Sequence, residues 1–421
     1  MNAFDTASVL IAVAALSGYI NHRFLKLPAT TGTLAVALVS SLVLVAIDIA
    51  VPAWGLRTVL VGFLREIDFN EALMHGMLCF LLFAGSLHID LSDLLENKWT
   101  VGILATVGVV ISTLAVGALT YLAFGWVGLD VPLVICLVFG ALISPTDPIA
   151  VMGLLKELKA PRTLEAQIAG ESLFNDGVAV VVFFGLVSAA DLSGPGELDA
   201  ITVSATGLTG FFLREVLGGA ALGLGLGWVG YHALKSLNEH SLELLITLAL
   251  VMFMYSLSFW IHVSGPIAVV LAGLLIGNPG RKLAMSDRTR EHVDAFWQML
   301  DEILNAVLFL LLGIEVFAVP AGPMAIAVGL LAVPVALLAR LVSVTVPITA
   351  MRLTGRYRRG LVPILTWSGL RGGISVAMVL SLPPFPARDY LLACTYAVVV
   401  FSILVQGLTV RRVLVHYGVG T

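Results

Sequence analysis

Long apolar runs dominate the sequence and limit how the chain can fold. Of its 421 residues, 59% are hydrophobic and only 12% are Asp, Glu, Lys or Arg, whereas soluble domains carry about 25% of these charged residues. A run of about 20 apolar residues is long enough to cross a bilayer as a helix. Because backbone groups in lipid must bond internally, such runs are expected to be helical. The sequence therefore predicts an all-α polytopic membrane protein embedded in the lipid bilayer.

The apolar runs predict about 13 transmembrane helices. The predicted spans are residues 4–21, 29–48, 70–88, 99–124, 131–153, 164–190, 209–235, 241–261, 264–278, 301–319, 322–351, 358–381 and 388–412. Two more polar segments, residues 51–69 and 281–300, are expected to be amphipathic helices at the membrane interface. No soluble domain is expected at either end, so residues 1–421 are predicted to form a single integral membrane unit.

The basic residues predict the orientation of the chain. Most of the 23 Lys and Arg residues fall in one set of alternate loops and in the C-terminal segment. The exceptions are Arg57, Arg65, Arg214 and Arg388 in the other loops, and Arg340 and Arg371 within spans. Short loops rich in Lys and Arg stay in the cytoplasm. We therefore predict an N-terminus outside the cell and a cytoplasmic C-terminus.

Several function classes have little support in the sequence. The net charge is −4 and there is no basic tail, so nucleic acid is not an expected partner. The three cysteines lie in apolar runs without metal-ligand spacing, and no cofactor is expected. A hydrolase built on His262 and Ser264 is disfavoured, because residues two apart on a helix do not face each other. The chain is therefore not expected to be an enzyme.

Two predicted spans carry signals that break a helix. Span five contains GALISPTDPIAV (140–151), where Pro148 removes a backbone donor and the residue before each proline is pushed towards extended geometry. We predict a break near Thr146 and Asp147. Span twelve contains GLRGGIS (369–375), in which glycines flank Arg371. Because the two spans are seven apart, they cross the membrane in opposite directions, and such a matched pair of broken helices points to a transporter site.

Span six carries a polar cluster, GESLFNDG (170–177), at membrane depth. At helical spacing Ser172 and Asp176 share one stripe, and Glu171 and Asn175 share the next. Hard cations such as Na⁺ prefer oxygen ligands, and ionisable residues within a span usually mark ion or proton paths. A polar network that only packs helices together is the alternative.

Arg340 lies in the middle of span eleven and needs an acidic partner. The candidates are Glu171 and Asp176. We favour Glu171, which leaves Asp176 free to exchange protons, and Arg371 is the rival partner for the acid. Asp301 and Glu302 are expected at the membrane interface, and Glu315 at a helix end.

Four motifs together identify a family. SPTDPIAV (144–151), GESLFNDGVAVVVF (170–183), SGPIAVVLAGLLIGN (264–278) and GLRGGISVAM (369–378), in this order, resemble the sodium/proton exchangers. More narrowly, the chain resembles the bacterial and archaeal NhaP-like branch of the monovalent cation/proton antiporters. The resemblance runs from about residue 5 to residue 412.

The resemblance implies an architecture. Members fold as two inverted six-helix repeats with two crossing broken helices, here spans five and twelve. Core ion-transport helices would occupy about residues 99–190 and 301–412, and dimerisation or scaffold helices about residues 1–88 and 209–278. The family also implies a homodimer in the inner membrane of a bacterial or archaeal cell.

The resemblance also implies which residues bind the ion. Asp176 is the ion-binding carboxylate, with Ser172 and Thr146 as further Na⁺ ligands. Asn175 is the amide of the Asn-Asp pair, and Asp147 lies on the crossing broken helix.

Three further residues correspond to structural positions of the family. Glu171 with Arg340 resembles the buried acid–arginine pair, and Arg371 would stabilise the crossing. Ala84 is a departure, because many relatives carry an acid at that position. The ligand that this acid would provide is absent, which leaves the ion preference open.

These features predict a secondary transporter of monovalent cations. A buried carboxylate that is neutralised by either a proton or a cation allows Na⁺ or Li⁺ to exchange for H⁺ by alternating access. Asn175 replaces the second acid of electrogenic relatives, which implies electroneutral 1:1 exchange. A K⁺/H⁺ antiporter of the same fold is the alternative, and a cation channel is a more distant one.

Overall fold

The structure is a computed structural model that describes residues 3–51, 77–192, 205–237, 239–280, 287–315, 322–352 and 360–420, and it is helical over most of them. Among these residues, nine helices are long and apolar enough to cross a membrane, and three shorter helices are also apolar. The chain is therefore a multi-pass, all-helical membrane protein. The number of thirteen spans stays a prediction, and residues 52–69 of the first expected interfacial helix lie outside the described parts of the chain.

Eighteen α-helices make up the described structure. In chain order they are α1 (Ala3–Ile20), α2 (Ala29–Ala50), α4 (Leu78–Leu87), α5 (Leu91–Glu96), α6 (Lys98–Ile103), α7 (Val109–Trp126), α8 (Leu133–Leu142), α9 (Ile149–Glu157), α10 (Arg162–Ala189), α11 (Ala205–Lys235), α12 (His240–Ile261), α13 (Gly265–Leu275), α15 (Asp287–Glu315), α16 (Pro323–Arg352), α17 (Leu361–Ser368), α18 (Gly373–Ser381), α19 (Arg388–Phe401) and α20 (Gly407–His416). Wider π-helical turns join α6 to α7 and α19 to α20, so each of these pairs continues as one rod.

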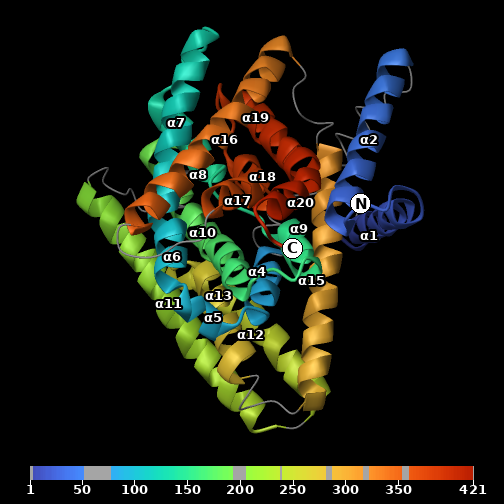
Figure 1. Cartoon of the computed structure of the whole chain (residues 1–421), viewed down its shortest axis with the longest axis vertical. Helices are drawn as coiled ribbons and strands as arrows, with labels where there is room; N and C mark the ends of the chain where they lie inside the picture. Colours follow the sequence, from blue (N-terminus) through green and yellow to red (C-terminus); the bar gives the residue numbers. More distant parts are fainter. Residues whose placement is uncertain are drawn as a thin grey trace.

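Helix α10 lies in the middle of the molecule (Figure 1). It packs against α8 on one side and against α11 and α13 on the other. Most of its residues are buried although the helix contains Glu171, Asn175 and Asp176. The polar cluster predicted for this span therefore lies inside the protein and is shielded from lipid.

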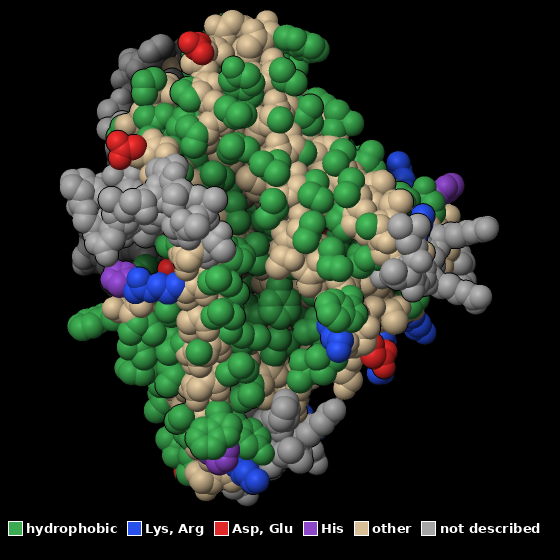
Figure 2. Space-filling model, turned by 90° about the vertical axis from the view of Figure 1, so that its left-hand side faces the viewer, with side chains coloured by type: hydrophobic (Ala, Val, Ile, Leu, Met, Phe, Trp, Pro, Cys, Tyr) green, Lys and Arg blue, Asp and Glu red, His purple; other side chains and the backbone are tan. Residues whose placement is uncertain are grey.

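Hydrophobic side chains cover most of the face shown in Figure 2, and charged side chains are few on it. Large apolar residues of the long helices, such as Leu122, Trp228 and Leu330, are strongly exposed. An exposed apolar surface of this extent is unstable in water but suits a protein surrounded by lipid.

Residues 281–286 of the second expected interfacial helix lie outside the described parts of the chain, and its described residues are not a separate element. Residues 287–300 belong to α15, which continues without a break to Glu315 and contains a candidate span at Arg290–Ile314. No proline or glycine occurs between Asp287 and Leu312, so nothing ends the helix. Its polar residues were read as a sign of the interface, but they lie along a helix that lines an internal cavity.

The first broken helix is interrupted where Pro148 predicts it. Helix α8 ends at Leu142 and α9 begins at Ile149. In the gap, Asp147 Oδ1 accepts a hydrogen bond from the backbone nitrogen of Ile149 at 2.9 Å, which satisfies a free amide at the start of α9.

The second broken helix is interrupted between Ser368 and Gly373, where α17 ends and α18 begins. The two breaks touch: the Asp147 backbone nitrogen donates to the Leu370 carbonyl at 2.8 Å. A Cβ atom on Gly372 would lie 2.5 Å from Asp147 Oδ2, so only glycine allows this approach. The contact brings together two segments more than 200 residues apart in the chain.

Candidate functional site

Arg371 fastens the two breaks to each other. Its side chain donates hydrogen bonds to the carbonyl oxygens of Ser144 and Pro145, the second at 2.7 Å. Its backbone nitrogen donates to Ser402 Oγ at 2.8 Å. The guanidinium group thus satisfies carbonyls that the break in span five leaves free, and its positive charge lies near the negative end of the α8 dipole.

Glu171 and Arg340 form a buried ion pair. The two N–O distances are 2.5 and 3.1 Å, and Arg340 also donates to the Leu365 carbonyl at 3.0 Å. Both side chains are almost fully buried. A two-pronged contact of this kind is the strong form of a charged hydrogen bond. The pair joins α10 to α16 and α17, and Arg371 takes no part in it.

Thr146 is held by two residues of α10. Asn175 donates from Nδ2 to Thr146 Oγ1 at 2.8 Å, and its Oδ1 accepts a longer bond, 3.4 Å, from the Thr146 nitrogen. Ser172 donates its hydroxyl hydrogen to the Thr146 carbonyl. The unwound backbone of the break is therefore fixed against the polar stripe of α10.

Asp176 differs from its neighbours. It is buried, and its Oδ1 atom accepts no hydrogen bond from any residue that the structure describes. A buried oxygen without a donor costs about 1–3 kcal/mol. A proton, a cation or a water that arrives from outside the chain can satisfy such an atom.

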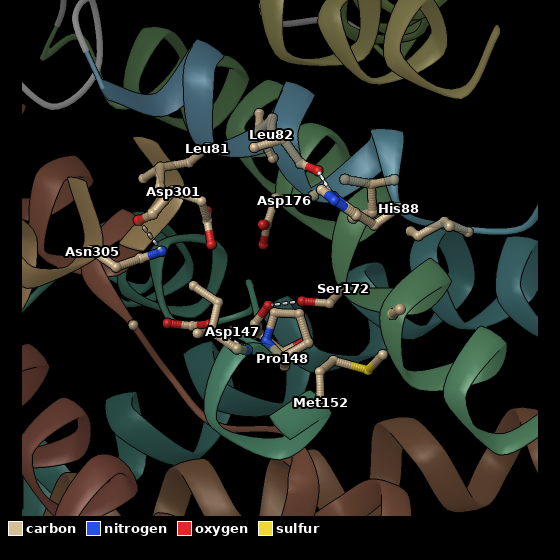
Figure 3. A pocket seen from close by; sticks show the side chains of 18 of the residues that line it. Leu81, Leu82, His88, Asp147, Pro148, Met152, Ser172, Asp176, Asp301 and Asn305 are labelled. Atoms are coloured by element: carbon tan, nitrogen blue, oxygen red, sulfur yellow. Dashed lines mark hydrogen bonds between the residues drawn. The ribbon is translucent and has the colours of Figure 1, made fainter. Parts of the chain in front are cut away.

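A cavity of about 700 Å³ lies in front of Asp176. Four of the predicted site residues line it: Thr146, Asp147, Ser172 and Asp176. The last three are labelled in Figure 3. Asn175 is not among its lining residues and faces Thr146 instead. Ala84 of α4 forms part of the wall and offers only a methyl group there. The structure thus gathers four of the predicted residues of spans five and six at one cavity.

Three lining residues were not recognised from the sequence. Asp301 and Asn305 of α15 and Ser375 of α18 all line the cavity. The expectation that Asp301 belongs to the membrane interface is wrong, because this residue is partly buried and Figure 3 shows it beside the space in front of Asp176. The spacing of Asp301 and Asn305, four residues apart in an apolar stretch, was the available signal.

Comparison with known proteins fits this geometry. The family model described as "Sodium/hydrogen exchanger, transmembrane" matches residues 11–416. The chain belongs to the sodium/hydrogen exchanger family. It is 46% identical over 411 residues to the Na⁺/H⁺ antiporter NhaP of Pseudomonas aeruginosa, which covers 96% of this chain and 95% of that protein. It is 33% identical to the Na⁺/H⁺ antiporter NhaH of Halobacillus dabanensis, covering 83% of this chain and 84% of that protein.

The fold is shared with a solved member of the family. The structure of the sodium proton antiporter MjNhaP1 from Methanocaldococcus jannaschii matches with a TM-score of 0.74 over 98% of this chain and 97% of that one. The sequence identity is only 17%, so this match concerns the fold. The resemblance identified from the four motifs is confirmed at the level of the family.

The Glu171–Arg340 pair generates a stability prediction. Glu171→Gln leaves the Arg340 charge buried without a counter-ion, and we expect a loss of about 3–5 kcal/mol of stability. The thermal unfolding midpoint of purified protein in detergent should fall by many degrees. The matched control is Glu157→Gln, which breaks an exposed pair with Arg411 at 3.2 Å and should change the midpoint little. Equal midpoints for the two variants would contradict the importance of the buried pair.

Proposed function

We propose that the chain exchanges Na⁺ or Li⁺ for H⁺ across the membrane. The observation that carries the proposal is Asp176, which lines a cavity beside two touching helix breaks and whose buried Oδ1 accepts no hydrogen bond from the residues that the structure describes. The named Na⁺/H⁺ antiporters to which the chain is similar support the same activity.

The proposed cation ligands are Asp176, Ser172 and Thr146. All three line the cavity, and all offer oxygen atoms, which hard cations prefer. Ser172 donates its hydroxyl hydrogen to the Thr146 carbonyl, so the lone pairs of its hydroxyl oxygen remain available to a cation. Asn175 acts indirectly in this proposal, because its amide fixes Thr146. Asp147 holds the start of α9 and faces the cavity beside them.

Cation transport is coupled to proton transport because the cation and the proton compete for the Asp176 carboxylate. A proton on Asp176 or a cation beside it removes the bare negative charge, and either loaded site can then move through the low-dielectric interior. The empty site retains its charge and moves poorly. The neighbouring Asn175 has an amide that does not titrate, so it adds no second exchangeable proton. One cation therefore exchanges for one proton, and no net charge crosses the membrane.

We further propose that the structure represents the state open to the cytoplasm. The exposed residues among those lining the cavity include Lys156 and Arg162. Both belong to a loop on the side that is rich in Lys and Arg, which the distribution of charge assigns to the cytoplasm.

The scaffold–core division implied by the family is part of the proposal. Helices α1, α2, α4 and α11–α13 would form the scaffold of a homodimer, and α6–α10 with α15–α20 the core, in the inner membrane of the cell. The two halves of each protomer would be inverted six-helix repeats.

The exchange proposal predicts the behaviour of Asp176→Asn in liposomes. Purified protein is reconstituted with a trapped pH-sensitive dye, a proton gradient is imposed, and Na⁺, Li⁺, K⁺ or choline is added outside. The wild type should dissipate the gradient with Na⁺ and Li⁺. Asp176→Asn should lose this response, because an amide neither binds a proton nor neutralises a cation. Asp389→Asn, an exposed residue at the start of α19, is the control and should keep it.

Other outcomes of this assay have definite meanings. A response to K⁺ alone would replace the Na⁺ proposal with K⁺/H⁺ exchange. Cation flux without proton movement would indicate a channel. A sustained current during exchange would contradict the electroneutral stoichiometry.

The orientation predicts which side of the membrane can label a new cysteine. The native Cys79, Cys136 and Cys394 are buried, so their own labelling by the maleimide should be low. We expect a membrane-impermeant maleimide to label Trp126→Cys in intact cells and to label Lys156→Cys only after the membrane is opened. Labelling of Lys156→Cys in intact cells would reverse the proposed topology.

The homodimer predicts a protein mass of twice 44.5 kDa in detergent. Light scattering combined with refractive index and absorbance separates this mass from that of the bound detergent. A mass of one chain under mild conditions would argue against the dimer.

A further inference from the structure

One face of α15 is a polar stripe that faces the cavity. The stripe consists of Gln298, Asp301, Glu302 and Asn305, followed by Leu308, and all five line the cavity. Their spacing of three or four residues places them on one side of a helix. The stripe follows from helix periodicity, and it presents four polar side chains along the wall opposite α10.

The stripe leads from the mouth of the cavity to the helix breaks. Gln298 is exposed, Asp301 is partly buried and Asn305 is buried. Leu308 touches the second break, because a Cβ atom on Gly373 would lie 2.5 Å from Leu308 Cδ1. Asn305, one turn before Leu308, therefore lies close to the first turn of α18, where Ser375 lines the same cavity.

Two side-chain oxygens at this deep end have no partner among the residues described. They are Asn305 Oδ1 and Ser375 Oγ, on residues that are only 2% and 1% exposed. Asn305 donates its Nδ2 hydrogen to the Asp301 carbonyl at 2.9 Å, which fixes the amide and leaves its oxygen free to accept. Buried oxygens of this kind are usually satisfied by a protein group, a water or an ion. Both residues line the same cavity, so a water or an ion that enters the cavity is a candidate for the missing partner.

Asp301, one helical turn before Asn305, supplies a negative charge to the same cavity. No Lys or Arg in the described parts of the chain forms an ion pair with it. In Figure 3 its carboxylate points into the space that Asp176 faces from α10. One carboxylate with two neutral oxygens matches a single positive charge of the hard class.

We propose that Asp301, Asn305 and Ser375 form a second cation position, which captures the incoming monovalent cation before Asp176 receives it. This inference rests on the proposed exchange function. The position lies between the exposed mouth and the Asp176 carboxylate, so an arriving ion is held next to its final ligands. The stripe raises the chance that Asp176 is filled at low cation concentration, and the exchange step itself remains with Asp176.

Asp301→Asn tests the proposal because the substitution removes the charge and keeps the shape. In the liposome assay we expect the KM for Na⁺ to rise about tenfold, while the maximal rate stays within about twofold, the signature of lost ground-state binding. Asp301→Glu should restore part of the affinity. The control is Glu291→Gln, which removes the same charge from an exposed residue of α15 that is not among the residues lining the cavity. Its KM should stay within about twofold of the wild type.

A binding measurement without transport gives an independent readout. Na⁺ that binds the folded state raises the unfolding temperature, because it stabilises that state by RT ln(1 + [Na⁺]/Kd). The Na⁺ concentration needed for a given rise should increase about tenfold in Asp301→Asn. Asn305→Ala keeps the charge and removes one neutral oxygen, so we expect about a threefold increase. This second variant keeps the proposal testable if Asp301→Asn does not yield folded protein.

The outcomes separate this inference from the proposed function. A wild type that exchanges Na⁺ for H⁺, with an unchanged KM in Asp301→Asn, would overturn the second cation position. Loss of the maximal rate in folded Asp301→Asn, without recovery in Asp301→Glu, would also overturn it and assign a structural role to Asp301. A wild type without any exchange would refute the exchange function itself.

Discussion

The contact between the two helix breaks is the interaction on which the site depends. Unwound backbone within a membrane protein exposes donors and acceptors that lipid cannot satisfy. Here the breaks largely satisfy each other: Asp147 bonds to Leu370, and Arg371 bonds to the carbonyls of Ser144 and Pro145. Neither break would be stable alone at this depth. Together they present Thr146 to α10 in a fixed position, which is the condition for a defined cation site.

Some of the charged residues around the contact stabilise the structure, and Asp176 is left to bind the ion. Arg340 is neutralised by Glu171, and Arg371 is bound to backbone oxygens. Both arginines are thus engaged through part of their guanidinium groups, and Asp176 Oδ1 accepts no hydrogen bond from the described residues. A carboxylate with a permanent arginine partner would hold no cation. Asp176 forms no ion pair with either arginine in the described structure, so its carboxylate remains available.

Covalent and local constraints were readable from the sequence, and tertiary ones were not. Pro148 locates the first break because its ring and missing donor act whatever surrounds it. Arg340 predicts a buried acid because a lone charge in a span must be paired, and the structure places Glu171 beside it. Asp301 was misjudged and Asn305 was overlooked because their surroundings depend on how the whole of α15 packs. The sequence shows that they share a face, but only packing decides whether that face meets a cavity, lipid or water.

The packing of α15 has a consequence for movement. Asn305 and Asp301 face the cavity from a helix whose next turns are fastened to α2: Ser41 donates to the Gly313 carbonyl at 2.8 Å, and at Gly313 a side chain would collide with Ala37. Asp176 lies on α10, and α2 is not among the helices that pack extensively against it. Both α10 and α15 belong to the proposed core, whereas α2 belongs to the proposed scaffold, so any movement of the core against the scaffold has to break or slide the contact at Gly313. This small contact would then mark the line along which the two domains slide past each other in each transport cycle.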